Sequence, residues 1–575
     1  MDKASIIGCL EEIAVLLELK GENPFKFRAY ENGARALETL EENFETLIDE
    51  KRLTDVSGIG AALAEKIETL YKTGKLDYYD KLKASVPAGV LEMLEVPGLG
   101  AKKVRVFYEK LKITSLEELK EACEAGKIAE LPGFGAKSQD NILSGINHLE
   151  AYRKRYMWAT VEPQVEAVLT GLRALPEVEL AECAGSFRRK LETVGDLDFL
   201  VASEAPEPVM DWFTRMPEVE KVTGHGTTKS SVRLEGGLQM DLRVVPKAQF
   251  FFALHHFTGS KEHNVKMRQR ALSQGFSLSE WGVKAVHEDH PAPIQEVDSE
   301  EELFQLFGLH YIPPELREGV GEVDYASHDA LPKLVKPEDI RGVFHNHTTA
   351  SDGKNTLEAM VAEAERLGFE YLGIADHSKS SFQANGLSEE KLLEQLKAIR
   401  KLNASKQYKT HVFAGVECDI LKDGSLDYED AVLEELDYVV ASVHNALTLD
   451  EAAMTRRIIR ALEHPCTTML GHLSGRLLLK REAYTVNIPK VIDAAIANKK
   501  IIELNASPKR LDMDWRYWHK AADRGLLCSI NPDAHSIEQL KNYRYGVYCA
   551  RKGWLQKCSV FNARPLKEVS AFLRG

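Results

Sequence analysis

The N-terminal part of the chain has apolar residues at helical spacing. Residues 1–85 contain several short amphipathic segments, the first of which is MDKASIIGCLEEIAVLLELK. Apolar residues three and four positions apart line one face of a helix, while polar residues occupy the other face. The pattern predicts an all-α region built from short helices.

Three helical segments in the first 150 residues follow the same short turn. In each, an apolar residue precedes Gly-x-Gly and a helical pattern follows, as in VSGIGAALA, VPGLGAKKV and LPGFGAKS. Each resembles a helix-hairpin-helix motif, whose glycines let a DNA phosphate approach backbone N–H groups at a helix N-terminus. One such turn is usually only a tight connection, but three with the same flanks indicate binding to the DNA backbone. The glycines are Gly58, Gly60, Gly98, Gly100, Gly133 and Gly135.

The pattern changes after residue 150. Helical spacing covers 161–175 and 261–274, and between them apolar and polar residues alternate. Alternation with period two is typical of strands, so this part predicts an α+β block with a mixed or antiparallel sheet. The alternating segments lie near 180–202, 229–247 and 281–286.

The last part of the chain alternates between strand-like and helical patterns. Residues 311–340 come first, with four prolines and no amphipathic period, which indicates an interdomain linker. From residue 341 onward, runs such as GVFHNH, YLGIADH, HVFAGVECDI and KIIELNAS are separated by helical segments. Parallel strands with crossover helices predict a (β/α) barrel, whose active site lies at the C-terminal ends of the strands.

Two carboxylates one residue apart, Asp196 and Asp198, lie in the apolar run GDLDFL. On a strand they point to the same face, where they repel each other unless a divalent cation lies between them. A third acid, Asp241, lies in the strand-like run MDLRVV. A pair of this kind alone is common on strand edges. The third acid, and a Gly185-Ser186 turn upstream that can hold phosphate oxygens, favour two-metal phosphoryl transfer.

Six histidines and three acids fall at the ends of successive strand-like runs after residue 341. Imidazole and carboxylate are preferred ligands of zinc, manganese and iron, and nine of them could hold three ions. A lone histidine at a strand end is usually structural, but this set predicts a metal cluster that hydrolyses phosphate bonds. The nine residues are His345, His347, Asp352, His377, Glu417, His444, His472, Asp533 and His535.

Composition narrows the class of protein only slightly. A chain of 575 residues exceeds one hydrophobic core, so three or more domains are expected. The net charge of −14 neither supports nor excludes nucleic-acid binding, because local basic patches suffice. The N-terminus lacks the features of a signal peptide, no run approaches the ~18 apolar residues of a membrane span, and no cysteines form a C-x-x-C pair. A reducing cytosol without a membrane partner is expected.

These motifs together resemble two known families. Residues 1–310 resemble a beta-like family-X DNA polymerase, and residues 341–575 resemble a polymerase-and-histidinol-phosphatase (PHP) domain. The fusion is similar to the PolX family of bacteria and archaea over essentially the whole chain. The resemblance implies a multidomain fold with N-terminal all-α helix-hairpin-helix domains, an α+β nucleotidyltransferase palm and thumb, and a C-terminal α/β PHP barrel. The implied divisions are a helical 8-kDa-like domain at 1–85, a fingers-type domain at 86–150, a palm at 151–250, a thumb at 251–315, a linker at 316–340 and the PHP domain at 341–575.

In the polymerase part, the resemblance implies Mg²⁺ or Mn²⁺ held by Asp196, Asp198 and Asp241, with Asp241 assisting deprotonation of the primer 3′-hydroxyl. It also implies contacts to the incoming nucleotide and to the template. The triphosphate positions are Ser186, Arg189 and Gly195, the sugar-gate positions are Phe257 and Gly259, the contact to the incoming base is Asn264, and the template contact is Arg268. His256 departs from the pattern, since eukaryotic relatives have tyrosine there.

In the PHP part, the resemblance implies up to three Mn²⁺ or Zn²⁺ (or iron) ions and a 3′–5′ exonuclease, with apurinic-site endonuclease or 3′-phosphatase activity as further options. The implied sets are His345, His347, Glu417 and Asp533 for the first ion, Glu417, His444 and His472 for the second, and Asp352, His377 and His535 for the third.

In the N-terminal part, Lys66 aligns with the Schiff-base lysine of 5′-deoxyribose-phosphate lyases. An accessory lysine of those lyases is Ala62 here, while Lys26 matches another basic position.

The expected function is template-directed filling of short gaps in DNA repair, with processing of 3′ ends by the PHP domain. Gapped or primer-template DNA and dNTPs are the expected partners, and we expect a monomer in the cytoplasm at the nucleoid of a prokaryote. Two alternatives stay open. One is a template-independent nucleotidyltransferase with a PHP small-molecule phosphatase, and the other is a DNA-binding scaffold with inactive centres.

Overall fold

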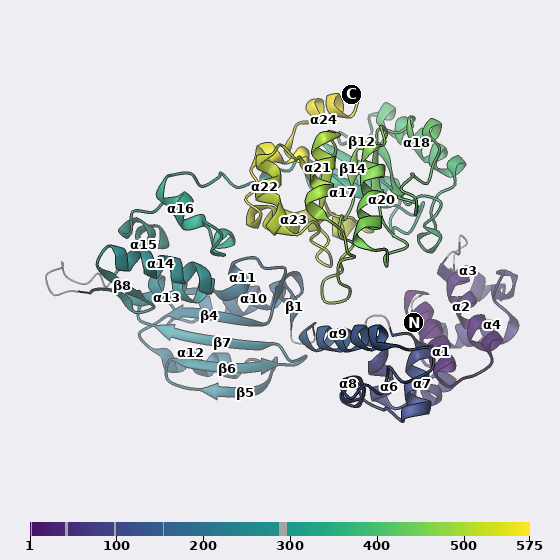
Figure 1. Cartoon of the computed structure of the whole chain (residues 1–575), viewed down its shortest axis with the longest axis horizontal. Helices are drawn as coiled ribbons and strands as arrows, with labels where there is room; N and C mark the ends of the chain where they lie inside the picture. The colour runs from purple at the N-terminus through teal and green to yellow at the C-terminus, as the bar shows by residue number, and fades with distance from the viewer. Residues whose placement is uncertain are drawn as a thin grey trace. The chain divides into compact units, whose positions relative to one another are not determined.

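The computed structural model describes residues 1, 3–38, 40, 44–96, 99–152, 155–286 and 296–574. The chain divides into two compact units, Met1–Arg153 and Lys154–Gly575 (Figure 1). Among the described residues, no helix combines the length and the apolar character that crossing a bilayer requires.

The first unit is all-α, as the helical spacing predicted. Two apolar cores hold it together, one around Leu17 and Ile67 and the other around Val104 and Phe107, all of which are buried. Three of its helices begin directly after the second glycine of a Gly-x-Gly turn. Its helices are α1 (Lys3–Leu19), α2 (Pro24–Glu38), α3 (Phe44–Asp49), α4 (Ala61–Thr73), α5 (Asp77–Ala84), α6 (Ala88–Glu92), α7 (Ala101–Leu111), α8 (Leu116–Glu124) and α9 (Ala136–Tyr152).

The second unit starts with a five-stranded mixed sheet in the order β2-β4-β7-β6-β5. The central pair β4–β7 is parallel and the other pairs are antiparallel. Leu197 and Phe199 of β4 enter the core shared with helices α10 and α12, so the residues between them belong to the opposite face. The elements are α10 (Trp158–Arg173), β2 (Leu180–Cys183), β4 (Asp196–Ala202), α12 (Pro206–Thr214), β5 (Val219–His225), β6 (Lys229–Leu234) and β7 (Gln239–Val245), with a small pair β1 (Tyr156–Met157) and β3 (Thr193–Val194) beside them.

A helical subdomain with one β-hairpin follows the sheet. Its core contains Phe252, Met267, Phe304 and Phe307, which are buried. The elements are α13 (Phe250–Thr258), α14 (Lys261–Ser273), β8 (Phe276–Ser279), β9 (Gly282–Ala285) and α15 (Glu300–Leu306).

Residues 311–340 connect this subdomain to the last part of the chain. They contain little regular structure apart from helix α16 (Glu322–Ser327). The segment is nevertheless packed along its length, because Arg317, Glu322 and Val335 are fully buried. The backbone N–H of Val335 donates to the carbonyl oxygen of Leu555 at 2.9 Å, so the connection is fixed to the C-terminal part.

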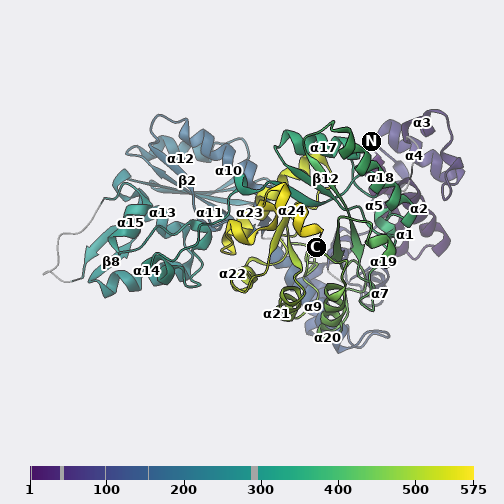
Figure 2. The ribbon, with the colours of Figure 1, turned by 90° about the horizontal axis from the view of Figure 1, so that it is seen from above.

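The C-terminal part is a nearly closed barrel of seven parallel strands in sequential order, as the alternating pattern predicted. The N–H of Phe344 donates to Asn531 Oδ1 at 3.2 Å, which brings the first and last strands together. Inward residues such as Phe344, Tyr438 and Met469 fill the interior, and helices surround the strands (Figure 2). The strands are β10 (Gly342–Asn346), β11 (Tyr371–Ile374), β12 (His411–Asp419), β13 (Tyr438–Ser442), β14 (Met469–Leu470), β15 (Ile501–Asn505) and β16 (Cys528–Asn531). The helices are α17 (Leu357–Arg366), α18 (Glu389–Ser405), α19 (Asp430–Leu433), α20 (Glu451–Glu463), α21 (Ile488–Ala497), α22 (Trp518–Asp523), α23 (Tyr543–Lys552) and α24 (Leu566–Leu573).

Two candidate metal centres

The three acids of the mixed sheet lie on two adjacent strands. Asp198 on β4 is directly opposite Asp241 on β7 in the parallel pair, and Asp196 is opposite Gln239. Because β4 turns its apolar residues into the core, both of its acids face away from that core. The structure therefore brings the three predicted carboxylates to one face of the sheet.

The charges of these acids interact strongly. Burial, together with the nearby carboxylates Asp196 and Asp241, raises the pKa of Asp198 to about 6. Burial also opposes ionisation of Asp241, but hydrogen bonds from Lys229 (2.7 Å), Ser231 and Gln239, together with the charge of Lys229, outweigh burial and hold the pKa of Asp241 below its usual value. A carboxylate forced to share space with like charges is a good ligand for a divalent cation, so the acids fit Mg²⁺ or Mn²⁺.

The fit to a cation is looser here than in the barrel. Among the residues that the structure describes, the three acids do not form a group whose ligand atoms all lie within 4.8 Å of one another. Lys229 supplies the positive charge beside Asp241, and sequence analysis missed it. Its position on β6, next to β7, is a property of the sheet order and carries no local sequence signal.

The predicted phosphate-binding turn packs against Asp198, one of the three acids. Gly185 has φ +59° and begins a short helical turn, Gly185–Arg188. A Cβ atom on Gly185 would lie 2.6 Å from Asp198 Oδ2, so this position has no room for a side chain. Ser186 follows within that turn, and Gly195 immediately precedes β4. The phosphate-binding candidates and the acids thus share one edge of the sheet.

Arg189, the predicted triphosphate contact, is already engaged by the helical subdomain. Its Nε lies 3.0 Å from Glu318 Oε1, and its guanidinium donates to the carbonyl oxygen of Thr258 at 2.5 Å. A Cβ on Gly259 would lie 3.2 Å from Nη1 of the same guanidinium. The absence of a side chain at Gly259 therefore leaves room for Arg189. Arg188 likewise pairs with Glu300 at 2.7 Å.

The predicted nucleotide-selection residues gather around His256. The side-chain amide of Asn264 donates to the carbonyl oxygen of His256 at 2.8 Å, and the guanidinium of Arg268 lies 3.2 Å from its Nδ1. The ring of Phe257 lies 4.6 Å from the guanidinium carbon of Arg243, which extends from the strand that carries the third acid. The thumb-type segment is therefore connected to strand β7, which carries Asp241, through a cation–π contact.

All nine predicted ligands of the barrel come together at the C-terminal ends of its strands. Glu417 on β12 lies at their centre. Its Oε1 is 2.9 Å from His472 Nε2, 3.1 Å from His444 Nε2 and 3.2 Å from His345 Nε2. Its Oε2 is 2.9 Å from His377 Nδ1. One carboxylate with imidazoles around both oxygens is the arrangement of a ligand that bridges metal ions.

By ligand-atom distance the nine residues fall into four overlapping groups, while the three implied sets stay a prediction. His444 and His472 share Glu417 but belong to separate groups, and His347 belongs to two groups. The nine residues thus form one continuous cluster with shared ligands. The groups whose ligand atoms lie within 4.8 Å are His347, Asp352, His377 and His535; His345, Glu417 and His472; His345, His347 and Asp533; and His377, Glu417 and His444.

The ligand atoms themselves test whether metal ions fit. Several are fully buried and lack a hydrogen bond of good geometry, which is costly for a polar atom unless another partner binds it. The donors are imidazole nitrogen and carboxylate oxygen, the set that zinc, manganese and iron prefer. The cluster therefore fits such ions. The atoms are His345 Nε2, His347 Nδ1 and Nε2, His377 Nδ1, His472 Nδ1 and Glu417 Oε2.

Two acids that sequence analysis missed hold the histidines in place. Glu503 Oε2 lies 2.5 Å from His345 Nδ1, and Asp419 Oδ1 lies 2.8 Å from His444 Nδ1. Each contact leaves the opposite ring nitrogen facing Glu417, and such partners increase the basicity of a metal ligand. Glu503 had a detectable signal, because an acid inside the apolar run KIIELNAS is unusual for a buried strand.

In the cluster, the negative charges of the acids stabilise the protonated form of two histidines. Burial favours neutral rings, but Glu417 and Asp419 outweigh it and raise the pKa of His444 to about 9. Asp352 and Asp533 similarly overcome burial and raise the pKa of His535 to about 9. Without an ion, these two imidazoles therefore carry protons at neutral pH.

Most of the described glycines of the three helical turns border open space; the exception is Gly58, where a Cβ would lie 3.5 Å from Ala36 Cβ and from the Asn32 carbonyl oxygen. Gly58 and Gly133 have φ of +96° and +86°, which favours glycine. Gly60 and Gly100 have negative φ, and a Cβ on either would meet no protein atom within 4 Å. A Cβ on Gly133 or Gly135 would also meet no protein atom within 4 Å. Gly98 lies outside the described residues. Packing within the protein thus does not explain the absence of side chains at Gly60 and Gly100.

Lys66 extends from helix α4 and is half-buried. Its ammonium donates to the carbonyl oxygen of Ala62 at 3.0 Å and lies 5.7 Å from the centre of the Tyr78 ring. The other basic candidate, Lys26, pairs with Glu22 at 3.3 Å.

Comparison with known proteins matches both parts of the chain. The helix-hairpin-helix domain matches residues 1–76, a SAM-like helix-hairpin-helix tandem matches 90–147, the DNA polymerase beta thumb matches 253–318, and the PHP domain matches 344–507. Rat DNA polymerase lambda is 26% identical to this chain over an alignment that covers 54% of this chain and 55% of the polymerase. A probable phosphatase of Caldicellulosiruptor saccharolyticus is 31% identical over 28% of this chain and 64% of its own length.

A full-length relative is the DNA polymerase/3′-5′ exonuclease PolX of Bacillus subtilis. It is 39% identical over 576 aligned residues, which cover 100% of each chain. The likeness spans the sheet with its three acids, the thumb and the metal-ligand cluster of the barrel. The chain therefore belongs to the PolX family, in which a family-X DNA polymerase is fused to a PHP domain.

Proposed function

We propose that this protein is a template-directed DNA polymerase that fills short gaps during base excision repair and trims 3′ ends with a metal-dependent 3′–5′ exonuclease. The observation that carries the proposal is the full-length likeness to a DNA polymerase/3′-5′ exonuclease, combined with both sets of ligands in this chain. The domain division given in the sequence analysis goes with this proposal, and the helix-hairpin-helix, thumb and PHP matches support it.

At the polymerase centre, Asp196, Asp198 and Asp241 would hold Mg²⁺ or Mn²⁺. Bound ions would neutralise the triphosphate and make the primer 3′-hydroxyl more acidic. Asp241, opposite Asp198, accepts the proton of that hydroxyl. The Gly185-Ser186 turn offers backbone N–H groups and a hydroxyl to the phosphate oxygens, and Arg189 supplies a positive charge.

At the PHP centre, the nine ligands would hold up to three Mn²⁺, Zn²⁺ or iron ions. Bound ions would supply a hydroxide nucleophile and clamp the scissile phosphodiester. Glu417 orients the ligand set because its two oxygens face five imidazoles, and Glu503 and Asp419 fix His345 and His444. Apurinic-site endonuclease and 3′-phosphatase activities would use the same centre, since both break a phosphate ester.

The helical turns of the N-terminal unit would bind the DNA backbone on either side of a gap. The open space at Gly60 and Gly100 supports this, because a phosphate oxygen can reach the N–H groups at the start of α4 and α7. Binding of this kind is independent of base sequence and weakens steeply with salt. The working protein would be a monomer at the nucleoid of a prokaryotic cell, with gapped DNA and dNTPs as substrates.

The test is a one-nucleotide gapped duplex with a 5′-phosphate, supplied with each dNTP in turn under Mg²⁺ and under Mn²⁺. We expect incorporation of the complementary nucleotide alone, and digestion from the 3′ end when dNTPs are withheld. Incorporation that ignores the template base would instead indicate a template-independent transferase. DNA binding without either activity would indicate a scaffold.

A 5′-deoxyribose-phosphate lyase at Lys66 is a separate proposal. It is tested by borohydride trapping of a covalent complex between the protein and DNA that carries a 5′-deoxyribose phosphate. Trapping in the wild type that is lost in Lys66→Ala supports the lyase. Trapping that persists in Lys66→Ala moves the nucleophile elsewhere.

A further inference from the structure

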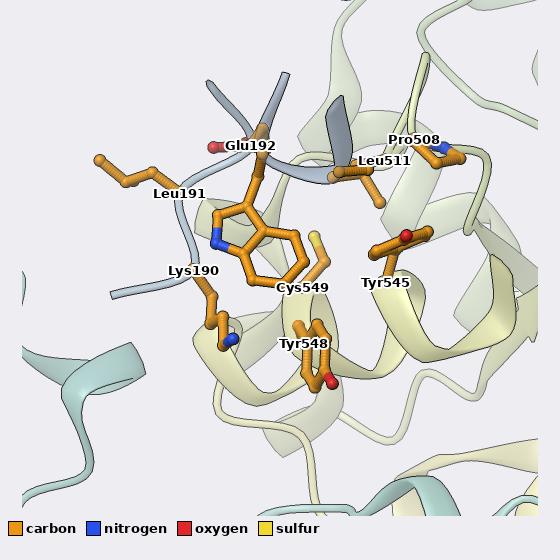
Figure 3. Close-up of a pocket in the computed structure, with 10 residues that line it drawn as sticks. Lys190, Leu191, Glu192, Pro508, Leu511, Tyr545, Tyr548 and Cys549 are labelled. Atoms are coloured by element: carbon orange, nitrogen blue, oxygen red, sulfur yellow. The ribbon is translucent and has the colours of Figure 1, made fainter. Parts of the chain in front are cut away.

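Helix α23 of the barrel packs against the phosphate-binding end of the palm. Figure 3 shows Lys190, Leu191 and Glu192 of the palm facing Tyr545, Tyr548 and Cys549 of α23 across a small pocket. Near the same pocket, Glu192 pairs with Arg476 of the barrel at 3.3 Å. These palm residues directly follow Arg189, so the barrel contacts the segment that carries the triphosphate-binding arginine.

The residue after Arg189 is held by aromatic rings from both parts. The ammonium of Lys190 lies 4.1 Å from the ring centre of Trp158 in the palm and 4.6 Å from that of Tyr548 on α23. Trp158 and Tyr548 also meet edge to face at 5.5 Å. Cation–π contacts strengthen as the cation is withdrawn from water, and Lys190 is half-buried. The backbone beside Arg189 is therefore fixed partly by the barrel.

Lys552, the last residue of α23, reaches Arg189 itself. It is 1% exposed, and its ammonium donates to the carbonyl oxygen of Arg189 at 3.1 Å. The same ammonium donates to Glu318 Oε1, the oxygen that also accepts from Arg189 Nε at 3.0 Å. One carboxylate thus faces two cations. Because Glu318 can neutralise only one of them, a positive charge remains at this edge of the nucleotide site.

We propose that Lys552 of the PHP domain is a positioning residue of the polymerase, which holds Glu318 and the Arg189 backbone so that the Arg189 guanidinium stays available for the incoming triphosphate. The inference rests on the proposed role of Arg189 in binding that triphosphate. Without the Lys552 ammonium, Glu318 would pair with Arg189 alone, and a nucleotide would have to break that ion pair before it could bind.

The proposal is tested with Lys552→Met, Glu318→Gln and the double variant, assayed on gapped DNA. Methionine keeps a long apolar side chain beside the Trp515 ring, which lies 4.7 Å from the ammonium, and removes only the charge. We expect Lys552→Met to raise KM for dNTP about tenfold, the scale of one weakened charge-assisted contact, with little change in kcat. Glu318→Gln alone should keep or lower KM. In the double variant KM should return close to the wild-type value.

Rescue separates positioning from simple support of the structure. If Lys552 only holds the domains together, removing Glu318 as well would leave KM as high as in Lys552→Met or higher, which would overturn the proposal. A wild-type KM in a well-folded Lys552→Met would also overturn it. Should Lys552→Met fail to fold, Glu318→Gln decides alone, since a raised KM there contradicts the proposal.

The matched control is Arg544→Ala, which removes a different contact between α23 and the palm, the ion pair with Glu162. It should leave KM for dNTP unchanged. Exonuclease activity should be the same in all of these variants, because none touches the metal ligands of the barrel. If the wild type does not incorporate nucleotides at all, the proposed function fails; if it does and the KM pattern is absent, only the role of Lys552 fails.

Discussion

Asp198 and Asp241 occupy directly opposite positions in the parallel pair β4–β7, although they lie 43 positions apart in the sequence. This register places one carboxylate on each strand at the same height beside the Gly185 turn. The pair makes this face of the sheet a candidate site for cations, and the charge of Asp241 raises the pKa of Asp198.

Asp198→Ala should abolish nucleotide incorporation and leave exonuclease activity intact. The variant removes the acid shared by the metal-binding face, while the ligand cluster of the barrel keeps every contact. Primer extension and 3′ digestion are measured on the same preparation. Asp211→Ala on helix α12, an acid paired with Arg215 on the surface, is the control and should change neither activity. Equal loss of both activities in Asp198→Ala would contradict independent centres.

Asp198→Asn should stabilise the protein in a chelator at pH 7.5 by about 1–2 kcal/mol. The pKa of Asp198 in the folded state, about 6, exceeds its value in the unfolded state, so ionisation of Asp198 lowers the free energy of unfolding. One pKa unit corresponds to about 1.4 kcal/mol, and partial exposure reduces the effect. The cost is absent below about pH 4 and complete above pH 6, so the advantage of the variant should vanish on acidification. Denaturant unfolding of both proteins at pH 4.5 and pH 7.5 measures this. An advantage that grows toward low pH would show that the sign is wrong.

His345→Ala combined with His347→Ala should lower exonuclease activity by about 100-fold or more while nucleotide incorporation continues. Both rings are fully buried among the ligand atoms. Glu503→Gln should lower it less, by about 10- to 100-fold, because it only orients His345. The double variant His310→Ala, His328→Ala, which changes two exposed histidines outside the barrel, serves as the control. Undiminished digestion in His345→Ala, His347→Ala would refute the PHP assignment.

Binding of Mn²⁺ to the barrel should release protons at pH 7.5 and tighten as the pH rises toward 9. His444 and His535 have pKa values of about 9 without an ion, and an imidazole must lose its proton to ligate a metal. Calorimetric titration in two buffers with different ionisation enthalpies gives the number of protons released. An observed binding enthalpy independent of the buffer would contradict the expectation.

Gly60→Ala and Gly100→Ala should weaken binding to duplex DNA several-fold, about 1 kcal/mol each, without lowering the melting temperature. Neither position requires glycine for its φ, and the new methyl group meets no protein atom. Gly8→Ala in helix α1 is the matched control, since its Cβ also meets nothing. Fluorescence anisotropy with labelled duplex measures the dissociation constant. Unchanged affinity in both variants would show that phosphates do not approach these turns.

Much of the fold and of the ligand sets was predictable because the relevant patterns are local. Period-two alternation determines that Asp196 and Asp198 share a face, and a run of strands ending in histidines determines where the barrel ligands gather. The partners of those ligands were harder to predict. Asp419 and Glu503 act through contacts with residues 25 and 158 positions away in sequence, which only the closed barrel brings together.

The engagement of Arg189 was beyond sequence reasoning for the same physical reason. Glu318 and Lys552 lie 129 and 363 positions from it, and they meet it only because residues 311–340 pack as a fixed connection. That segment was expected to be a linker, and its prolines gave no indication that Arg317 and Glu322 would be buried. Packing, rather than periodicity, decides such contacts.

The packing of helix α23 against the palm has a consequence for how this protein can evolve. A gene split after residue 340 would give a polymerase fragment whose Trp158 face loses the cover of Tyr545 and Tyr548, while the half-buried carboxylate of Glu318 loses one of its two counterions. Such a half-protein would tend to aggregate and would bind nucleotides less well. The contacts of α23 with the palm therefore favour keeping the polymerase and the PHP domain in one chain.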